Sequence, residues 1–85
     1  MITLTPTSKS FLIYKNLVKG FNEGCTIVIR HDIEGTEHPL DFFPIEYTRS
    51  WLVHFDPLEL AGGHHYLEVK DGEKTIYQEK LYYAI

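Results

Sequence analysis

The sequence lacks what several functional classes require. Its one cysteine, Cys25, excludes an intramolecular disulfide. No hydrophobic run approaches the roughly 18 residues of a membrane-spanning helix. The first residues, Met1 to Pro6, do not have the charged and then apolar layout of a secretory signal. We therefore expect a soluble protein that is made in the cytosol and does not contact a membrane.

Positive charge is also scarce. Eight Lys and Arg against twelve Asp and Glu give a formal net charge of −4, and the basic residues are scattered singly along the chain. A surface that follows a phosphate backbone needs clustered positive charge. We therefore expect no nucleic-acid partner.

The chain is nevertheless rich in residues that build a core. Hydrophobic residues make up 44% of the sequence and aromatic residues 14%, and each aromatic side chain can bury roughly 150–250 Å². Its 85 residues predict a single domain over residues 1–85, near the small end of what folds without help. A chain this small, with neither a disulfide nor a structural metal motif, often gains stability by assembling with partners.

Apolar and polar residues alternate along most of the chain, which is the period of a β-strand. One face is apolar from Cys25 to Ile33, and again from Ser50 to Phe55. Between these segments, Pro39 and Pro44 interrupt any regular ladder, so residues 38–47 are predicted to form an edge strand or a connection. The pattern predicts an all-β sandwich of about seven short antiparallel strands.

Turn signals lie between the predicted strands. Asp71-Gly72 predicts a hairpin near the C-terminus, and a change of phase predicts a β-bulge at residues 78–80. Asp56 followed by Pro57 is typical of a helix start, which predicts one short helical turn near residues 56–61.

A corner motif follows this turn. Leu60, Gly62 and Gly63 precede Tyr66 at the start of an alternating strand. At the corner between two sheets of a sandwich, a tyrosine is buried and its hydroxyl bonds to backbone upstream. We therefore expect Tyr66 to be buried and bonded near residues 58–61. With the hairpin and the closing strand that follow, the motif indicates the end of an immunoglobulin-like fold.

Five histidines raise the question of a metal site. His31 and Asp32 point to opposite faces of a regular strand, as do His64 and His65. Neither pair can therefore chelate one ion. We expect no metal and no cofactor, and histidines whose ring nitrogens are satisfied by hydrogen bonds at the surface or at the edge of the core.

No residue is assigned a catalytic role. Cys25 shares an apolar strand face, which favours a buried and inert thiol. Asp32 and Glu34 stand two residues apart, and protection of an edge strand by charge explains them better than acid–base chemistry does. We therefore expect a protein that is not an enzyme.

The aromatic residues allow a role in the core, in glycan stacking or in protein contacts. Inward and outward aromatic residues alternate rather than line up, which favours the core over a glycan platform. Tyr14, Tyr77 and Tyr82 are the candidates for a contact surface. Tyrosine is enriched at interface hot spots, so those that are exposed predict protein–protein contact.

The C-terminal third carries a family resemblance. Its residues, in order, are Leu58, Leu60, Gly62-Gly63, Tyr66, Val69, Asp71-Gly72, Leu81, Tyr83 and Ile85. This order resembles that of small immunoglobulin-like virion proteins of tailed bacteriophages, notably phages of Bacteroides-type hosts. Fibronectin type III domains share the leucine, glycine and tyrosine corner.

The resemblance implies a structural role in a capsid, neck or tail. It implies contacts with other virion proteins or with copies of the chain, in a homo- or hetero-oligomer. The location would be the virion, after synthesis in the host cytoplasm. The alternative is a small binding module or phage-encoded inhibitor acting on a host protein or a glycan, because acidic charge and small size fit that role equally well.

Overall fold

A computed structural model describes residues 2–14, 18, 20–45, 50–55 and 60–85. Its strands are β1 (Ile2–Leu4), β2 (Ser10–Tyr14), β3 (Thr26–His31), β4 (Glu37–Leu40), β5 (Phe42–Pro44), β6 (Ser50–His54), β7 (Gly63–Asp71) and β8 (Lys74–Tyr83). The described residues contain no helix, and so none with the length and apolar character to cross a membrane. The helical turn expected near residues 56–61 falls mainly on residues 56–59, which lie outside the described residues.

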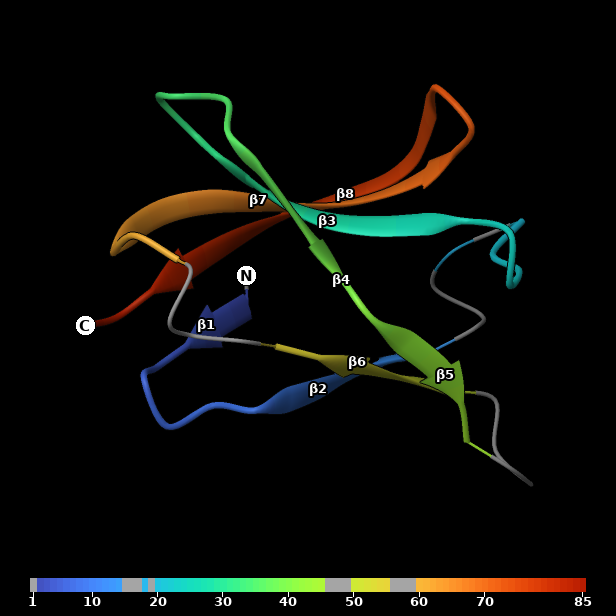
Figure 1. The fold of residues 1–85 in the computed structure, drawn as a ribbon, viewed down its shortest axis with the longest axis horizontal. Helices are drawn as coiled ribbons and strands as arrows, with labels where there is room; N and C mark the ends of the chain where they lie inside the picture. The colour runs from blue at the N-terminus through green and yellow to red at the C-terminus, as the bar shows by residue number, and fades with distance from the viewer. Residues whose placement is uncertain (1, 15–17, 19, 46–49, 56–59) are drawn as a thin grey trace.

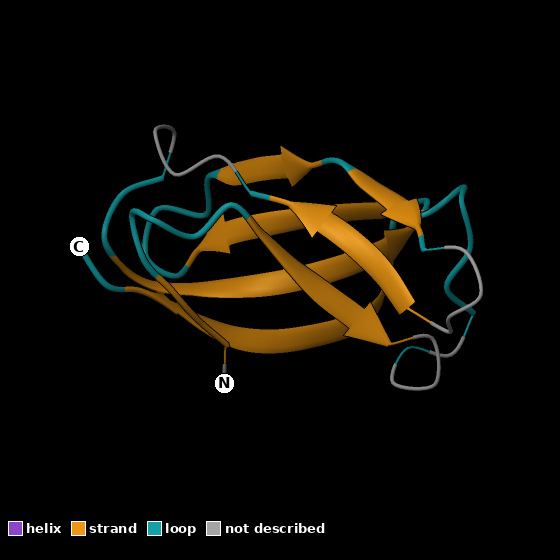
Figure 2. Ribbon diagram, turned by 90° about the horizontal axis from the view of Figure 1, so that it is seen from below, coloured by secondary structure: helices purple, strands orange, loops and turns teal. Residues whose placement is uncertain are grey.

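The strands form two sheets that enclose a common core (Figure 1). Five strands form one sheet in the order β1-β8-β7-β3-β4, and three form the other in the order β2-β6-β5. Figure 2 looks onto the layers from the side of the three-stranded sheet and shows loops gathered at the two ends. The predicted all-β sandwich is confirmed, with eight strands among the described residues instead of about seven.

One strand pair is parallel. β1 runs in the same direction as β8, with Ile2 opposite Leu81 and Leu4 opposite Tyr83. Beyond the pair, the backbone N–H of Ala84 donates to the carbonyl oxygen of Leu4 at 2.8 Å. The expectation of antiparallel strands throughout is therefore wrong at this position, while the other described pairs are antiparallel.

The core takes its side chains from alternating positions on both sheets. Among the most deeply buried are Ile27, Ile29, Val53, Phe55, Leu67, Val69 and Leu81. Each contributes about 1.5–3 kcal/mol relative to an exposed side chain. The predicted inward faces are confirmed for Cys25 to Ile29 and for Ser50 to Phe55. Ile33 instead lies in the turn after β3 and is exposed, so the predicted strand extends two residues too far at its C-terminal end.

Both prolines of the interrupted segment lie on edge strands. Pro39 is in β4, at the edge of the five-stranded sheet, and Pro44 is in β5, at the edge of the three-stranded sheet. The chain crosses from one sheet to the other at Asp41. Proline has no N–H to donate to a ladder and is tolerated at such edges. The edge-strand prediction is confirmed, and the segment supplies one edge to each sheet.

β7 and β8 form a long hairpin. Asp71 pairs with Lys74, so Gly72 and Glu73 make a two-residue turn in which Gly72 has a φ of +65°. The hairpin predicted from Asp71-Gly72 is confirmed. The β-bulge, predicted at residues 78–80, lies earlier, where Ile76 is the extra residue between two pairs. There Ile76 and its neighbour Tyr77 both pack against the core, which places the change of phase between them.

Candidate functional site

The buried residue at the corner before β7 is a histidine. His65 is 2% exposed, and its Nε2 lies 2.7 Å from the carbonyl oxygen of Ala61. It shares the inward face of β7 with Leu67 and Val69, whereas Tyr66 is only partly buried on the opposite face. The expectation of a buried Tyr66 is therefore wrong, because side chains alternate along the strand and the inward position falls one residue earlier.

The other predicted corner residues lie where the turn requires them. Leu60 is buried in the core, and Gly63 has a φ of +113°, a conformation that favours glycine. Gly62 is open to solvent but packs closely against the chain end, since an added Cβ would lie 2.7 Å from Cδ1 of Ile85. These three residues shape the backbone that presents Ala61 to His65.

The hydrogen bond fixes the tautomer of His65. A carbonyl oxygen only accepts, so Nε2 carries the proton and Nδ1 is left with a lone pair. Nδ1 is buried and has no hydrogen-bond partner among the described residues. Burial lowers the pKa of His65 below its ordinary 6.5, and the nearby His31 and His38 lower it further. The hydrogen bond to Ala61 and the charge of Asp32 act in the opposite direction and raise it. The folded protein therefore favours a neutral imidazole here.

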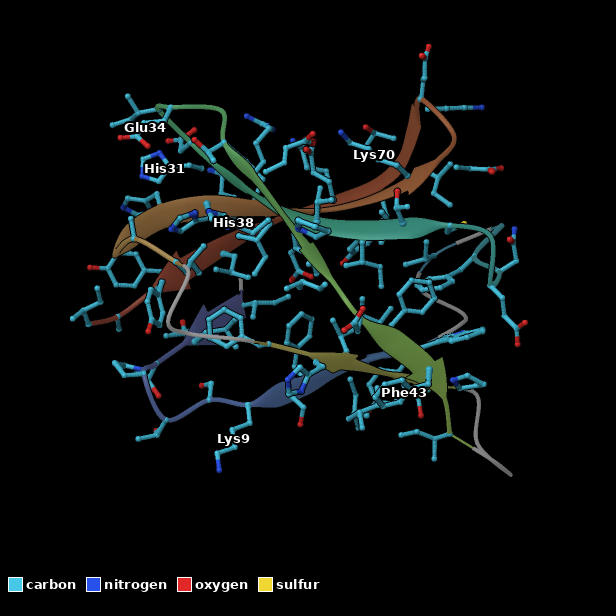
Figure 3. The ribbon with its side chains drawn as sticks, viewed as in Figure 1. Lys9, His31, Glu34, His38, Phe43 and Lys70 are labelled. Atoms are coloured by element: carbon cyan, nitrogen blue, oxygen red, sulfur yellow. The ribbon has the colours of Figure 1, made fainter. Side chains whose placement is uncertain are left out.

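His31 faces His65 across the β3–β7 pair. The two rings meet edge to face with centroids 4.9 Å apart. Nδ1 of His31 accepts hydrogen bonds from the backbone N–H groups of Ile33 and Glu34, at 3.2 and 3.1 Å, and so closes the turn between β3 and β4 (Figure 3). This histidine supports a turn.

Within the described residues, no three His, Cys, Asp or Glu side chains come close enough to hold a metal ion. A hollow of about 360 Å³ beside the corner is lined by Asp32, His64, His65, Tyr66 and Lys80. Cys25 is buried, as predicted, and its Sγ lies 3.8 Å from the carbonyl oxygen of Gly20. Its thiol therefore faces backbone.

The outer face of the five-stranded sheet carries a closed polar network. Glu68 is 6% exposed and accepts a hydrogen bond from Nε of Arg30 at 2.9 Å and one from Nε2 of Gln78 at 3.1 Å. The guanidinium of Arg30 also lies 5.0 Å from the centroid of the Tyr66 ring. The charged groups at the centre of this face are thus satisfied within the chain.

The outer face of the three-stranded sheet is different. Leu12, Leu52 and Phe43 lie side by side across β2, β6 and β5. Leu12 is 46% exposed and Phe43 is 49% exposed. Such a cross-strand apolar row on an open sheet face is the kind of surface at which another protein binds. We call this surface, with Tyr14 at its end, the apolar face.

The three candidate tyrosines do not form one surface. Tyr14 is 53% exposed and belongs to the apolar face. Tyr82 lies on the other sheet, where its ring meets that of His64 at 5.0 Å. Tyr77 is half-buried, and the bond from its hydroxyl to Oε2 of Glu79 raises the pKa of Tyr77 to about 12.

Leu12, Leu52 and Phe43 were missed from the sequence because each belongs to a different strand. The available signal was β2 itself, whose residues Phe11 to Tyr14 are apolar on both faces. One face of such a strand enters the core, and the other remains apolar at the surface.

Neither a family model nor a curated protein matches this chain. The surfaces described above, together with the resemblance in the C-terminal third, are therefore the basis for a functional proposal.

Proposed function

We propose that this chain is a non-enzymatic, immunoglobulin-like β-sandwich that serves as a structural component of a tailed-bacteriophage virion. It acts by contacting copies of itself or other virion proteins. The contrast between the two outer faces carries the proposal: one face satisfies its charges internally, while the other exposes Leu12 and Phe43. A surface of the second kind gains free energy when another protein covers it.

The strand order supports an immunoglobulin-like arrangement. If β1 is labelled A′ and β2 to β8 are labelled B, C, C′, D, E, F and G, the two sheets read A′-G-F-C-C′ and B-E-D. Immunoglobulin domains place G, F and C in one sheet, extended by C′, against B, E and D in the other. β7 then corresponds to strand F, and His65 occupies the corner position usually held by tyrosine.

The virion role is inferred from the resemblance. The hairpin after Asp71 and the inward positions of Leu81 and Tyr83 agree with it, whereas Tyr66 does not take the buried corner position. In this role the chain would join or decorate parts of a capsid, neck or tail. Many copies in one assembly would add together contacts that are weak one at a time.

A second candidate is a small binding module or phage-encoded inhibitor of a host protein. The exposed rings of Phe43 and Tyr14 favour it, because aromatic side chains frequently anchor protein interfaces. A glycan has less support, since Leu12 and Leu52 stand on the same face and the rings form no continuous row.

Mass spectrometry of purified particles tests the proposal. Phage particles whose genome encodes this chain should contain it in a fixed ratio to the major capsid protein. If the chain is absent from the particles, and a pull-down from host lysate returns one stoichiometric host protein, the second candidate replaces the first.

A further inference from the structure

We propose that the apolar face binds the same face of a second copy, with a two-fold axis that runs parallel to the strands of the three-stranded sheet. This inference deepens the proposed structural role and rests on it, because it identifies the surface through which copies meet. The occupant is a second molecule of this chain, and the geometry of the contact follows from the strand register.

The outward side chains of the three-stranded sheet form three rows across β2, β6 and β5. The rows are Ser10, His54 and Asp41; then Leu12, Leu52 and Phe43; then Tyr14, Ser50 and Ile45, of which Ser50 is buried, at 5% exposure. The middle row has no ionisable side chain, and the only carboxylate in the three rows is that of Asp41. The centre of this face can therefore be buried without desolvating a charge.

Among the described residues, one lysine stands beside the rows. Lys9 directly precedes β2, and in Figure 3 it points away from the five-stranded sheet. Its carbonyl oxygen accepts the N–H of Phe55, which places it at the same end of the sheet as Asp41, whose carbonyl accepts the N–H of His54. Lys9 and Asp41 thus flank the same end of the face from opposite edges, because β2 and β5 are the two edge strands.

A two-fold axis parallel to the strands exploits this placement. It lays β2 of one copy over β5 of the other, so that Leu12 meets Phe43 of the second copy and Leu52 meets Leu52. It also brings Lys9 next to Asp41 of the second copy, twice. An axis perpendicular to the strands would instead lay β2 over β2 and separate these charges. Charge complementarity therefore selects the parallel axis, which also keeps the packed sheets aligned.

The contact is small. Three strands of about five residues give a face of about 14 by 17 Å, which is less than the roughly 800 Å² per partner of a standard interface. We therefore expect a dimer with a dissociation constant in the micromolar range or weaker, which becomes stable where many copies are held in one assembly.

Sedimentation velocity of the purified chain, from about 10 µM to about 1 mM, tests the dimer. The wild type should shift from monomer toward dimer as the concentration rises. Phe43→Glu buries a charge in the middle row and should weaken the dimer at least about tenfold. Ile33→Glu is the matched control, because Ile33 is also exposed but lies in the turn after β3, and it should change nothing.

Exchanging the charges of Lys9 and Asp41 tests the direction of the two-fold axis. Lys9→Asp and Asp41→Lys should each weaken the dimer about two- to fivefold at low salt, and the double variant should restore it. A monomer throughout the concentration range, a dimer unaffected by Phe43→Glu, or a double variant that is no better than its parents would overturn the inference. Circular dichroism of each variant shows that the fold is retained.

The two proposals fail separately. A chain that dimerises through this face but is absent from particles keeps the inference and removes the virion role. If the chain is present in particles but monomeric in solution, and Phe43→Glu does not affect its incorporation, the virion role is kept and the dimer inference is removed.

Discussion

His65 donates its Nε2 proton to the carbonyl oxygen of Ala61 across 2.7 Å, and this bond ties the start of β7 to the chain that leads into it. The donor is almost fully buried, at 2% exposure. A hydrogen bond of this kind adds a modest net stabilisation, and a buried ring N–H left without its acceptor is costly. The corner therefore depends on the identity of one side chain.

His65→Ala should reduce the free energy of unfolding by about 2–4 kcal/mol, because it removes both the ring from the core and the donor to Ala61. Urea denaturation followed by circular dichroism measures the change. The neighbouring His64 is exposed, so His64→Ala should stay within about 0.5 kcal/mol of wild type. Equal effects of the two substitutions would contradict the assignment of the corner to His65.

Stability should fall as the pH drops below about 6.5. The pKa of His65 is lowered in the folded state, so between its folded and unfolded values the unfolded chain holds more protons. Stability from this group is thus present above the unfolded pKa and is lost as the pH falls toward the folded pKa. Denaturation at several pH values from 8 down to about 5 measures the slope.

His65→Gln keeps an N–H donor but does not titrate, so its stability should depend less on pH in this range, by up to about 1.4 kcal/mol per pH unit. His54→Gln replaces an exposed histidine on β6 and should leave the pH dependence close to that of wild type. If the free energy of unfolding has the same slope against pH in His65→Gln and in the wild type, the buried imidazole is not the source of the pH dependence.

Tyr66→Phe should leave stability within about 0.5 kcal/mol of wild type, because the hydroxyl is not the buried anchor of the corner. Tyr66→Ala should cost more, about 0.5–1 kcal/mol, since it removes the ring next to the Arg30 guanidinium. Thermal and urea unfolding of both variants check this order. A large loss in Tyr66→Phe would restore the tyrosine to the corner role.

Glu68→Ala should destabilise the fold by about 1–3 kcal/mol, because Arg30 and Gln78 both lose the carboxylate to which they donate. The control is Glu37→Ala, which breaks a more exposed ion pair with Lys70 and should cost at most about 1 kcal/mol. The difference in denaturation midpoints between the two variants is the measurement. If Glu37→Ala proves the more costly, the network on the outer face does not stabilise the sheet.

The local parts of the fold were readable from the sequence. The phases of β3 and β6 and the hairpin after Asp71 follow from alternation and turn chemistry, which involve only neighbouring residues. The parallel pairing of β1 with β8 could not be read in this way. It joins Ile2 to Leu81 across nearly the whole chain, and the alternation of a strand does not state the direction of its partner.

The corner shows how residue type can mislead. Alternation already placed His65 on the same face as Leu67 and Val69, and Tyr66 on the other. The expectation for Tyr66 followed the usual residue at such corners, whereas the strand phase gave the correct inward position. The apolar face was not predicted from the sequence for another reason. Leu12, Leu52 and Phe43 become neighbours only through the register of three strands.

The parallel pair of β1 and β8 has a mechanical consequence. Because the two strands run in the same direction, a pull that separates the N-terminal end of β1 from the C-terminal end of β8 slides one strand along the other. The bonds of the pair, and the bond from Ala84 to Leu4, lie across that pull and share the load together. The β7–β8 hairpin, pulled apart at its open end, would instead give way one bond at a time. Tension between the start of β1 and the end of β8 therefore meets more resistance than tension that opens the β7–β8 hairpin.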